Sequence, residues 1–342
     1  MKLKQDIWLN ASDMSKNMAI LKVVDLKKYF PVQKSFLERI FSKKIEYVEA
    51  VDRISFKVKK GEIFALAGES GCGKTTTGRL ITRLIQPTGG KIFFKGREVT
   101  FLQGEKLRKF RKNVQIIFQN PYASLNPRMK IGDAVGHPLE IHGIATGEGK
   151  KKIVLEMLEK VGLEPAEKFY ATYPYELSGG QRQRVAIARA MILNPEFVVA
   201  DEPISMIDVS LRAKILELML KLKEERDLTY LFITHDLAVA KYISDWIAIM
   251  YLGKIVEVGR KEEIFSHSQH PYTKALLSAI PVPDPRAKRE YVKLEGEVPS
   301  SINPPSGCRF HPRCSLAKEK CRTSEPPLTS VNKDHQVACH LC

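Results

Sequence analysis

A run of glycines and small polar residues near position 70 has the composition of a phosphate-binding loop. The run reads Gly68, Glu69, Ser70, Gly71, Cys72, Gly73, Lys74 and Thr75. It follows a short apolar stretch typical of a buried strand and precedes a predicted helix over residues 74–85. In this setting the glycines let backbone N–H groups turn toward phosphate oxygens at a positive helix end. Lys74 would reach the outer phosphates of a nucleotide, and the Thr75 hydroxyl would ligate Mg²⁺.

Two carboxylates follow the second apolar run, residues 197–200. Asp201 and Glu202 stand where a buried strand would end. Beside a phosphate loop, Asp201 would lie near the Mg²⁺ ion and Glu202 would accept a proton from an attacking water. The sequence therefore predicts hydrolysis of the bound nucleotide.

A third segment indicates a second anion site. Ser178 and two glycines, with Gly180 and Gln181 at the end of the run, precede a predicted helix over residues 181–193. A helix N-terminus of this kind attracts anions. Because the chain already has one phosphate loop, the second site makes sense if it serves the nucleotide of another subunit.

Taken together, these segments resemble the ABC ATPase family. The resemblance implies ATP and Mg²⁺ as ligands, and two subunits paired head to tail so that each ATP lies between a phosphate loop and the opposite signature helix. It also implies that Gln119 touches Mg²⁺ and senses a membrane partner, and that His235 holds the γ-phosphate. Thr76, directly after Thr75, joins the nucleotide-binding residues on the same basis.

Two further segments narrow the resemblance to the oligopeptide/dipeptide importer branch, in its F-type subunits. They are residues 120–129, directly after Gln119, and residues 270–277. This branch implies a second ABC ATPase subunit, two transmembrane permease subunits and, indirectly, an external substrate-binding protein. It also implies a peripheral position on the cytoplasmic face of the cell membrane. Some members serve oligosaccharides or nickel instead, so the cargo stays open.

The aromatic residue that would stack on adenine has two candidates. Matching by the first strand favours Phe30, whereas matching by the distance to the phosphate loop favours Tyr47. The sequence leaves this choice open.

Five of the six cysteines gather near the C-terminus. Cys308, Cys314, Cys321 and Cys339 are separated by five, six and seventeen residues. Clustered thiols in a cytosolic chain indicate a metal site more than disulfides. Four soft ligands at these spacings favour a 4Fe-4S cluster over zinc, which is the alternative, as is unliganded cysteine. Cys342 would be the spare thiol.

The formal net charge of +16 favours contact with anions. It is the only support for a rival interpretation, a soluble ABC ATPase acting on nucleic acid or ribosomes. Neither the long coiled-coil insertion nor the second cassette usual in such proteins is present, and we expect no nucleic-acid partner. A third possibility, an ATP-binding subunit without hydrolysis, is disfavoured by the intact Glu202 and His235.

These residues require an α/β fold. Alternating strands and helices predict a mainly parallel sheet covered on both faces. The family resemblance adds an antiparallel β subdomain and an inserted helical subdomain at about residues 120–190. We expect a disordered leader over residues 1–18, the nucleotide-binding domain over 19–258, and a small irregular cysteine-containing region over 259–342. Prolines between residues 281 and 305 predict a stiff linker.

Overall fold

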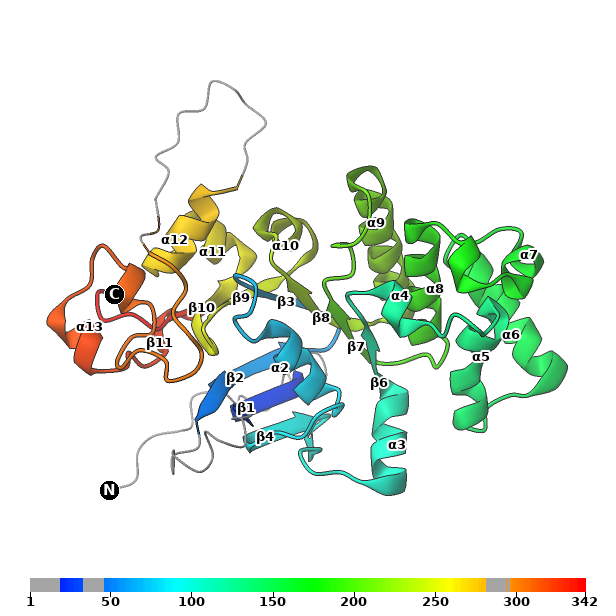
Figure 1. Ribbon diagram of the computed structural model, residues 1–342, viewed down its shortest axis with the longest axis horizontal. Helices are drawn as coiled ribbons and strands as arrows, with labels where there is room; N and C mark the ends of the chain where they lie inside the picture. The colour runs from blue at the N-terminus through cyan, green and yellow to red at the C-terminus, as the bar shows by residue number, and fades with distance from the viewer. Residues whose placement is uncertain (1–18, 33–45, 281–293, 295) are drawn as a thin grey trace, which may run out of the picture.

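The computed structural model describes residues 19–32, 46–280, 294 and 296–342 (Figure 1). The expected leader, residues 1–18, lies outside these residues, as do residues 281–293 and 295 of the proline-rich segment. Within the described residues the chain forms two β-sheets with helices around them. No helix in the described ranges combines the length and the apolar character needed to cross a bilayer.

The larger sheet has a parallel centre and an antiparallel margin. In spatial order its strands are β11 (Thr329–Asn332), β12 (His335–Val337), β10 (Lys254–Arg260), β9 (Trp246–Tyr251), β3 (Ile63–Ala67), β8 (Thr229–Thr234), β7 (Phe197–Asp201) and β6 (Val114–Ile117). From β9 to β6 every pairing is parallel. Strands β3, β7 and β8 are buried throughout, which explains their largely apolar sequences. The mainly parallel core is confirmed.

The smaller sheet is antiparallel. Its order is β2 (Tyr47–Lys59), β1 (Ala19–Pro31), β4 (Gly89–Phe94) and β5 (Arg97–Glu98). Along β2 the buried residues Ile54, Phe56 and Val58 alternate with exposed ones, so one face lies on the core. Helix α2 (Lys74–Ile81) shares a hydrophobic cluster with both sheets. The antiparallel subdomain implied by the family resemblance is thereby confirmed.

Helix α2 is shorter than predicted. Instead of continuing to residue 85, it ends at Ile81, and Arg83 adopts a left-handed φ of +57°. The N–H groups that follow bond back onto the helix, Arg83 to Leu80 and Leu84 to Arg79, as at a helix C-terminus. The apolar spacing alone did not reveal this turn.

The helices between Gln119 and β7 form a separate lobe at one end of the molecule (Figure 1). They are α4 (Pro121–Ser124), α5 (Ile131–Ile141), α6 (Gly147–Lys160), α7 (Ala166–Ala171), the 3₁₀ turn η2 (Pro174–Glu176) and α8 (Gly179–Met191). A single hydrophobic cluster joins this lobe to β7, β8 and α9 (Val209–Arg226). The lobe has the position of the expected helical subdomain.

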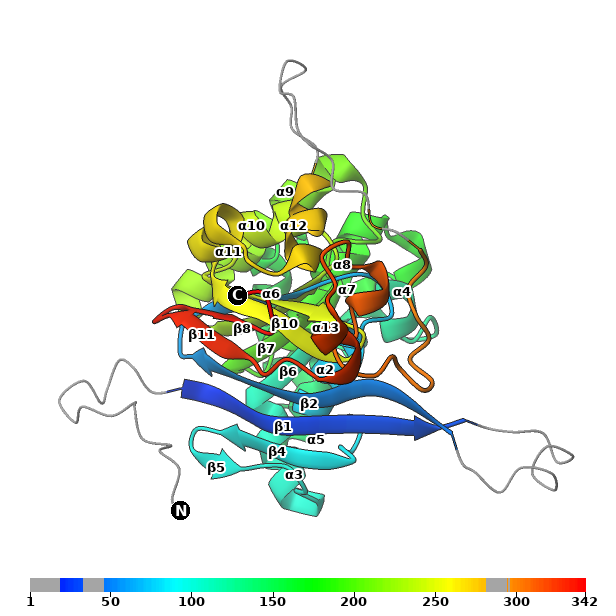
Figure 2. The same cartoon turned by 90° about the vertical axis from the view of Figure 1, so that its left-hand side faces the viewer.

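The remaining helices and turns are α3 (Gly104–Asn113), α10 (Leu237–Ile243), α11 (Lys261–His267), α12 (Pro271–Ser278), η3 (His311–Arg313) and α13 (Glu319–Thr323). Strand β12 pairs with β10, and β11 pairs with β12 at the margin of the larger sheet. Seen from the side, β11 and α13 lie beside β10 (Figure 2). The C-terminal region therefore contributes strands to the core sheet, which its irregular sequence did not predict.

Candidate nucleotide-binding site

The phosphate loop joins the carboxyl end of β3 to the first residue of α2. Gly73 caps the helix with φ at +108°, and a β-carbon there would collide with the carbonyl oxygen of Ala50 in β2. Only glycine satisfies both conditions. Lys74 is buried, and its Nζ donates to the carbonyl oxygens of Gly68 at 2.8 Å and Glu69 at 2.9 Å. Gly71 and Ser70 are exposed at the turn of the loop, which leaves it open to a ligand.

Thr75 and Asp201 face each other across the end of the sheet. Thr75 Oγ1 donates to Asp201 Oδ1 at 2.9 Å. The pKa of Asp201 is raised above its ordinary value, chiefly by burial and also by the charge of Glu202. The hydrogen bond from Thr75 acts in the opposite direction. A hydroxyl and a carboxylate at this distance form a pair of oxygen ligands suited to Mg²⁺.

Glu202 receives two neighbours from other strand ends. Gln119, which follows β6, donates from Nε2 to Glu202 Oε2 at 2.8 Å. His235, which follows β8, lies with Nδ1 at 3.1 Å from the same oxygen. Glu202 adopts a left-handed φ of +46°, and its N–H donates to the Ile233 carbonyl oxygen. Such backbone strain in a non-glycine residue is frequent at functional sites.

The ends of parallel strands explain why these residues meet. β3, β6, β7 and β8 run in the same direction, so the segments that follow them emerge at one edge of the sheet. The predicted residues of the phosphate loop, both carboxylates, Gln119 and His235 are therefore brought together.

The signature segment begins α8 in the helical lobe. Ser178 is the N-cap: its Oγ accepts from the Gln181 N–H, and the Gln181 side chain accepts from the Ser178 N–H. This reciprocal capping box leaves Ser178 exposed at a helix N-terminus. Gly180 is buried, and a β-carbon there would press on Leu211 of α9.

One contact that the sequence did not predict links this helix to the segment after Gln119. The Arg182 guanidinium lies 3.8 Å from the centre of the Tyr122 ring. Arg182 is buried, whereas Tyr122 is 59% exposed. A cation stacked on an aromatic ring joins α8 to α4.

The two candidates for adenine stacking lie at one end of the β1–β2 pair. Phe30 pairs with Val48, and Tyr47 pairs with Pro31. Phe30 is 37% exposed and Tyr47 is 44% exposed. Both rings are accessible, and the choice between them stays open.

The C-terminal cysteines share one neighbourhood without forming a ready-made metal site. Burial, together with the charges of Cys321, Cys339 and Cys314, raises the pKa of the Cys308 thiol to about 11. The Cys308 N–H donates to the Cys321 carbonyl oxygen at 2.8 Å. Nowhere in the described ranges, however, are three or more His, Cys, Asp or Glu side chains arranged to hold a metal ion.

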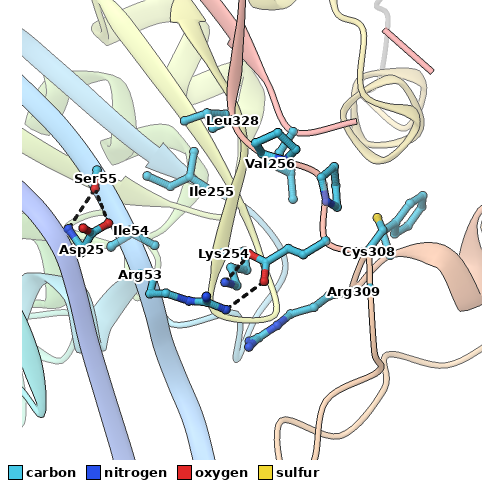
Figure 3. A pocket seen from close by; sticks show the side chains of 16 residues that line it. Asp25, Arg53, Ile54, Ser55, Lys254, Ile255, Val256, Cys308, Arg309 and Leu328 are labelled. Carbon is cyan, nitrogen blue, oxygen red and sulfur yellow. Dashed lines mark hydrogen bonds and ion pairs between the residues drawn. The ribbon is translucent and has the colours of Figure 1, made fainter. Parts of the chain in front are cut away.

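A buried carboxylate fixes the same C-terminal segment to the antiparallel sheet. Asp52 of β2 accepts from Lys254 at 2.7 Å, Arg309 at 2.7 Å and the Tyr29 hydroxyl at 2.5 Å. Beside it lies a cavity of about 260 Å³, where Arg53, Lys254 and Arg309 approach from three segments of the chain (Figure 3). The sequence did not predict this network, because its members are far apart in the chain.

Comparison with known proteins agrees with this site. Residues 51–205 match the ABC transporter family, and residues 256–321 match the family described as oligopeptide/dipeptide transporter, C-terminal region. The oligopeptide transport ATP-binding protein AppF of Bacillus subtilis is 49% identical over 94% of this chain and 97% of its own length. The dipeptide transport ATP-binding protein DppF of Haemophilus influenzae is 48% identical over 96% and 98%.

A solved structure has the same cassette. The dimeric post-hydrolysis state of the ATP-binding cassette MJ0796, bound to ADP and Pi, aligns with a TM-score of 0.61 at 32% identity. The alignment covers 70% of this chain and 98% of the other. The fold and the site thus define an ABC-type ATPase. More narrowly, the chain belongs to the ATP-binding subunits of oligopeptide/dipeptide ABC transporters.

Proposed function

We propose that this subunit hydrolyses ATP to energise the import of oligopeptides or dipeptides. The meeting of Gln119 and His235 on the Glu202 carboxylate, beside the Thr75–Asp201 pair, is the observation that supports hydrolysis most directly. The transport role is supported by relatives named for oligopeptide and dipeptide transport at nearly full length. Import of oligosaccharides or nickel remains the alternative cargo.

Each site residue has a proposed role. Lys74 and the backbone of the phosphate loop bind the phosphates, and Thr75, Gln119 and Asp201 hold Mg²⁺. Glu202 accepts a proton from the attacking water, and His235 orients the γ-phosphate. A water held by Glu202 in line with the γ-phosphorus would complete the reaction.

The signature segment would serve the nucleotide of a second ATPase subunit. An exposed helix N-terminus presents a positive dipole end to an anion. Ser178, Gly180 and Gln181 stand at such an end. We therefore propose a head-to-tail dimer beneath two permease subunits at the cytoplasmic face of the membrane. An external substrate-binding protein would deliver the cargo to the permeases.

The cysteine-rich segment fits a 4Fe-4S cluster by the chemistry of its donors. Cys308, Cys314, Cys321 and Cys339 are soft ligands that share one partly buried neighbourhood. The cluster would cross-link a segment that has little apolar core of its own; zinc is the alternative. Bringing the four thiols together on metal binding would couple that binding to the folding of the segment.

Reconstitution tests the proposed function. The full chain, its partner ATPase and the permeases are placed in lipid vesicles, and ATP hydrolysis is measured with the binding protein, with and without peptides. We expect peptide-loaded binding protein to stimulate hydrolysis. Stimulation by oligosaccharide or nickel instead would reassign the cargo, and stimulation by nucleic acid or ribosomes alone would overturn the transport role.

A further inference from the structure

The cysteine-bearing segment, residues 308–339 (called the cysteine-rich segment above), contacts the phosphate loop directly. Arg313 donates from Nη1 to Glu69 Oε2 at 2.8 Å and from Nη2 to Glu69 Oε1 at 3.2 Å. Glu69 is the second residue of the phosphate loop. The Arg313 side chain is 8% exposed and that of Glu69 is 27% exposed, so solvent screens this two-pronged pair only in part.

The same loop residue is also held through its backbone. The Glu69 N–H donates to the Tyr272 hydroxyl at 3.0 Å. Tyr272 is fully buried, with its ring centre 4.7 Å from that of Tyr251 and 5.4 Å from that of Phe310. Phe310 belongs to the cysteine-bearing segment. Residues from outside the cassette motifs therefore hold Glu69 at both its side chain and its main chain.

These contacts reach the lysine that binds phosphate. Lys74 Nζ donates to the Glu69 carbonyl oxygen, so Glu69 lies between Arg313 on one side and Lys74 on the other. A movement of the Glu69 peptide would change the position of the loop and the acceptors of Lys74. Because the loop binds the phosphates through backbone N–H groups, its affinity depends on this position.

The position of Arg313 is in turn set by the cysteine-bearing segment. Arg313 ends the 3₁₀ turn η3 and directly precedes Cys314. The Cys314 N–H donates to the His311 carbonyl oxygen, and the Cys308 N–H donates to that of Cys321. On the same segment Arg309 donates to the Leu252 carbonyl oxygen and to Asp52. Loosening the turn between Cys308 and Cys314 would displace Arg313.

We propose that Arg313 is a positioning residue for the phosphate loop, through which the cysteine-bearing segment sets the affinity of this subunit for ATP. The inference rests on the ATP-binding role of the chain and not on the identity of any bound metal. It predicts that a change more than 200 residues downstream in sequence alters nucleotide binding through Glu69, since 244 positions separate the two partners.

The test measures the dissociation constant of ATP for the full chain by equilibrium dialysis. Arg313→Ala should weaken binding about tenfold, the size expected when a charge-assisted hydrogen-bonded pair is lost. Arg313→Lys keeps the charge without the second hydrogen bond and should recover part of the affinity. Arg322→Ala, an exposed arginine in the same segment, is the matched control and should bind as the native chain does.

A double-mutant cycle with Glu69→Gln separates positioning from general stabilisation. In the Glu69→Gln background, where one acceptor oxygen is left, Arg313→Ala should cause a much smaller loss than in the native chain. The exchange Glu69→Arg with Arg313→Glu should restore most of the affinity. The pair Cys308→Ser and Cys314→Ser should weaken ATP binding only while Glu69 is intact. Unchanged ATP affinity in folded Arg313→Ala, or losses that add fully in the cycle, would overturn the proposal.

If Arg313→Ala fails to fold, Arg313→Lys and Glu69→Gln still decide the question. Each should raise the dissociation constant of ATP, and their combination should be little worse than Glu69→Gln alone. In the assembled transporter the same variants should raise the KM for ATP more than they lower kcat. The peptide-stimulated turnover of the native reconstituted complex is measured alongside each variant. A native complex that peptide does not stimulate would show that the transport role fails, separately from the effect of Arg313 on ATP binding.

Discussion

Gln119 and Glu202, which are 83 positions apart in sequence, share a hydrogen bond of 2.8 Å at the carboxyl end of the sheet. The accepting oxygen is the one that lies 3.1 Å from His235 Nδ1. A proposed general base is thus oriented from two sides by residues of neighbouring strand ends. Fixed orientation of this kind favours proton transfer from a water held near the carboxylate.

Replacing that base should separate binding from turnover. In Glu202→Gln the amide keeps the size of the side chain but loses basicity, so ATP binding should persist while hydrolysis falls ~10²–10⁴-fold. Steady-state phosphate release and ATP binding by the assembled transporter check this. Glu224→Gln, an exposed glutamate on α9, is the control. Near-normal turnover in Glu202→Gln would remove Glu202 from the role of base.

The signature segment should act on the neighbouring subunit. Ser178→Arg places a bulky cation at the N-terminus of α8 and should block hydrolysis at the partner's phosphate loop more than at this chain's own loop. Ser178→Ala removes only the cap, at a cost of about 1 kcal/mol of stability. Nucleotide trapping with the two sites labelled separately distinguishes the loops. Loss confined to this chain's own site would contradict the head-to-tail arrangement.

The cysteine-rich segment should contain iron and sulfide. We expect anaerobically purified protein to be brown and to hold the two elements in near-equal amounts. Serine at Cys308, Cys314, Cys321 or Cys339 should remove the metal, whereas Cys342→Ser should retain it. Metal analysis and the visible spectrum provide the readout. Stoichiometric zinc without iron would assign the alternative metal, and no metal at all would exclude both.

Asp52 should make the junction with the C-terminal segment sensitive to acid. Burial acts to raise its pKa, but hydrogen bonds from Lys254 and Tyr29 outweigh burial and hold the pKa below its ordinary range. The stabilisation is therefore full at neutral pH and is lost as the pH falls below about 4, where an ordinary carboxyl takes up a proton. Urea unfolding measured at several pH values should show stability declining over this range.

Substitution at the same position gives a second measure of this network. Asp52→Ala removes the buried partner that Lys254 and Arg309 share and leaves them only the more exposed Glu325 and Glu49. It should lower the free energy of unfolding by about 3 kcal/mol, the lower end of the range for breaking a buried ion pair. Glu325→Gln is the contrast, since Glu325 also pairs with Lys254 but is 45% exposed. That change should cost less than about 1 kcal/mol. Equal effects of the two substitutions would argue against the burial of Asp52 as the cause.

The parts predicted well from sequence are those in which function and fold coincide locally. Only glycine can adopt the φ of Gly73 and its close approach to Ala50, and Asp201 ends a buried strand. Both features can be predicted from a few neighbouring residues. The contacts of Asp52 and Glu69 with Arg309 and Arg313 are different. Each joins ordinary charged residues more than 200 positions apart, and no periodicity links them.

The pairing of β12 with β10 makes synthesis order matter for this cassette. His335, buried beside Glu257 with Nε2 at 2.8 Å from its carboxylate, enters the chain 78 residues after it. Until β12 has left the ribosome, the outer edge of β10 presents unpaired N–H and C=O groups, and such an edge is a template for pairing with another chain. A nascent chain halted between the two strands would contain every motif of the nucleotide site and still expose an unpaired strand edge that can bind another chain.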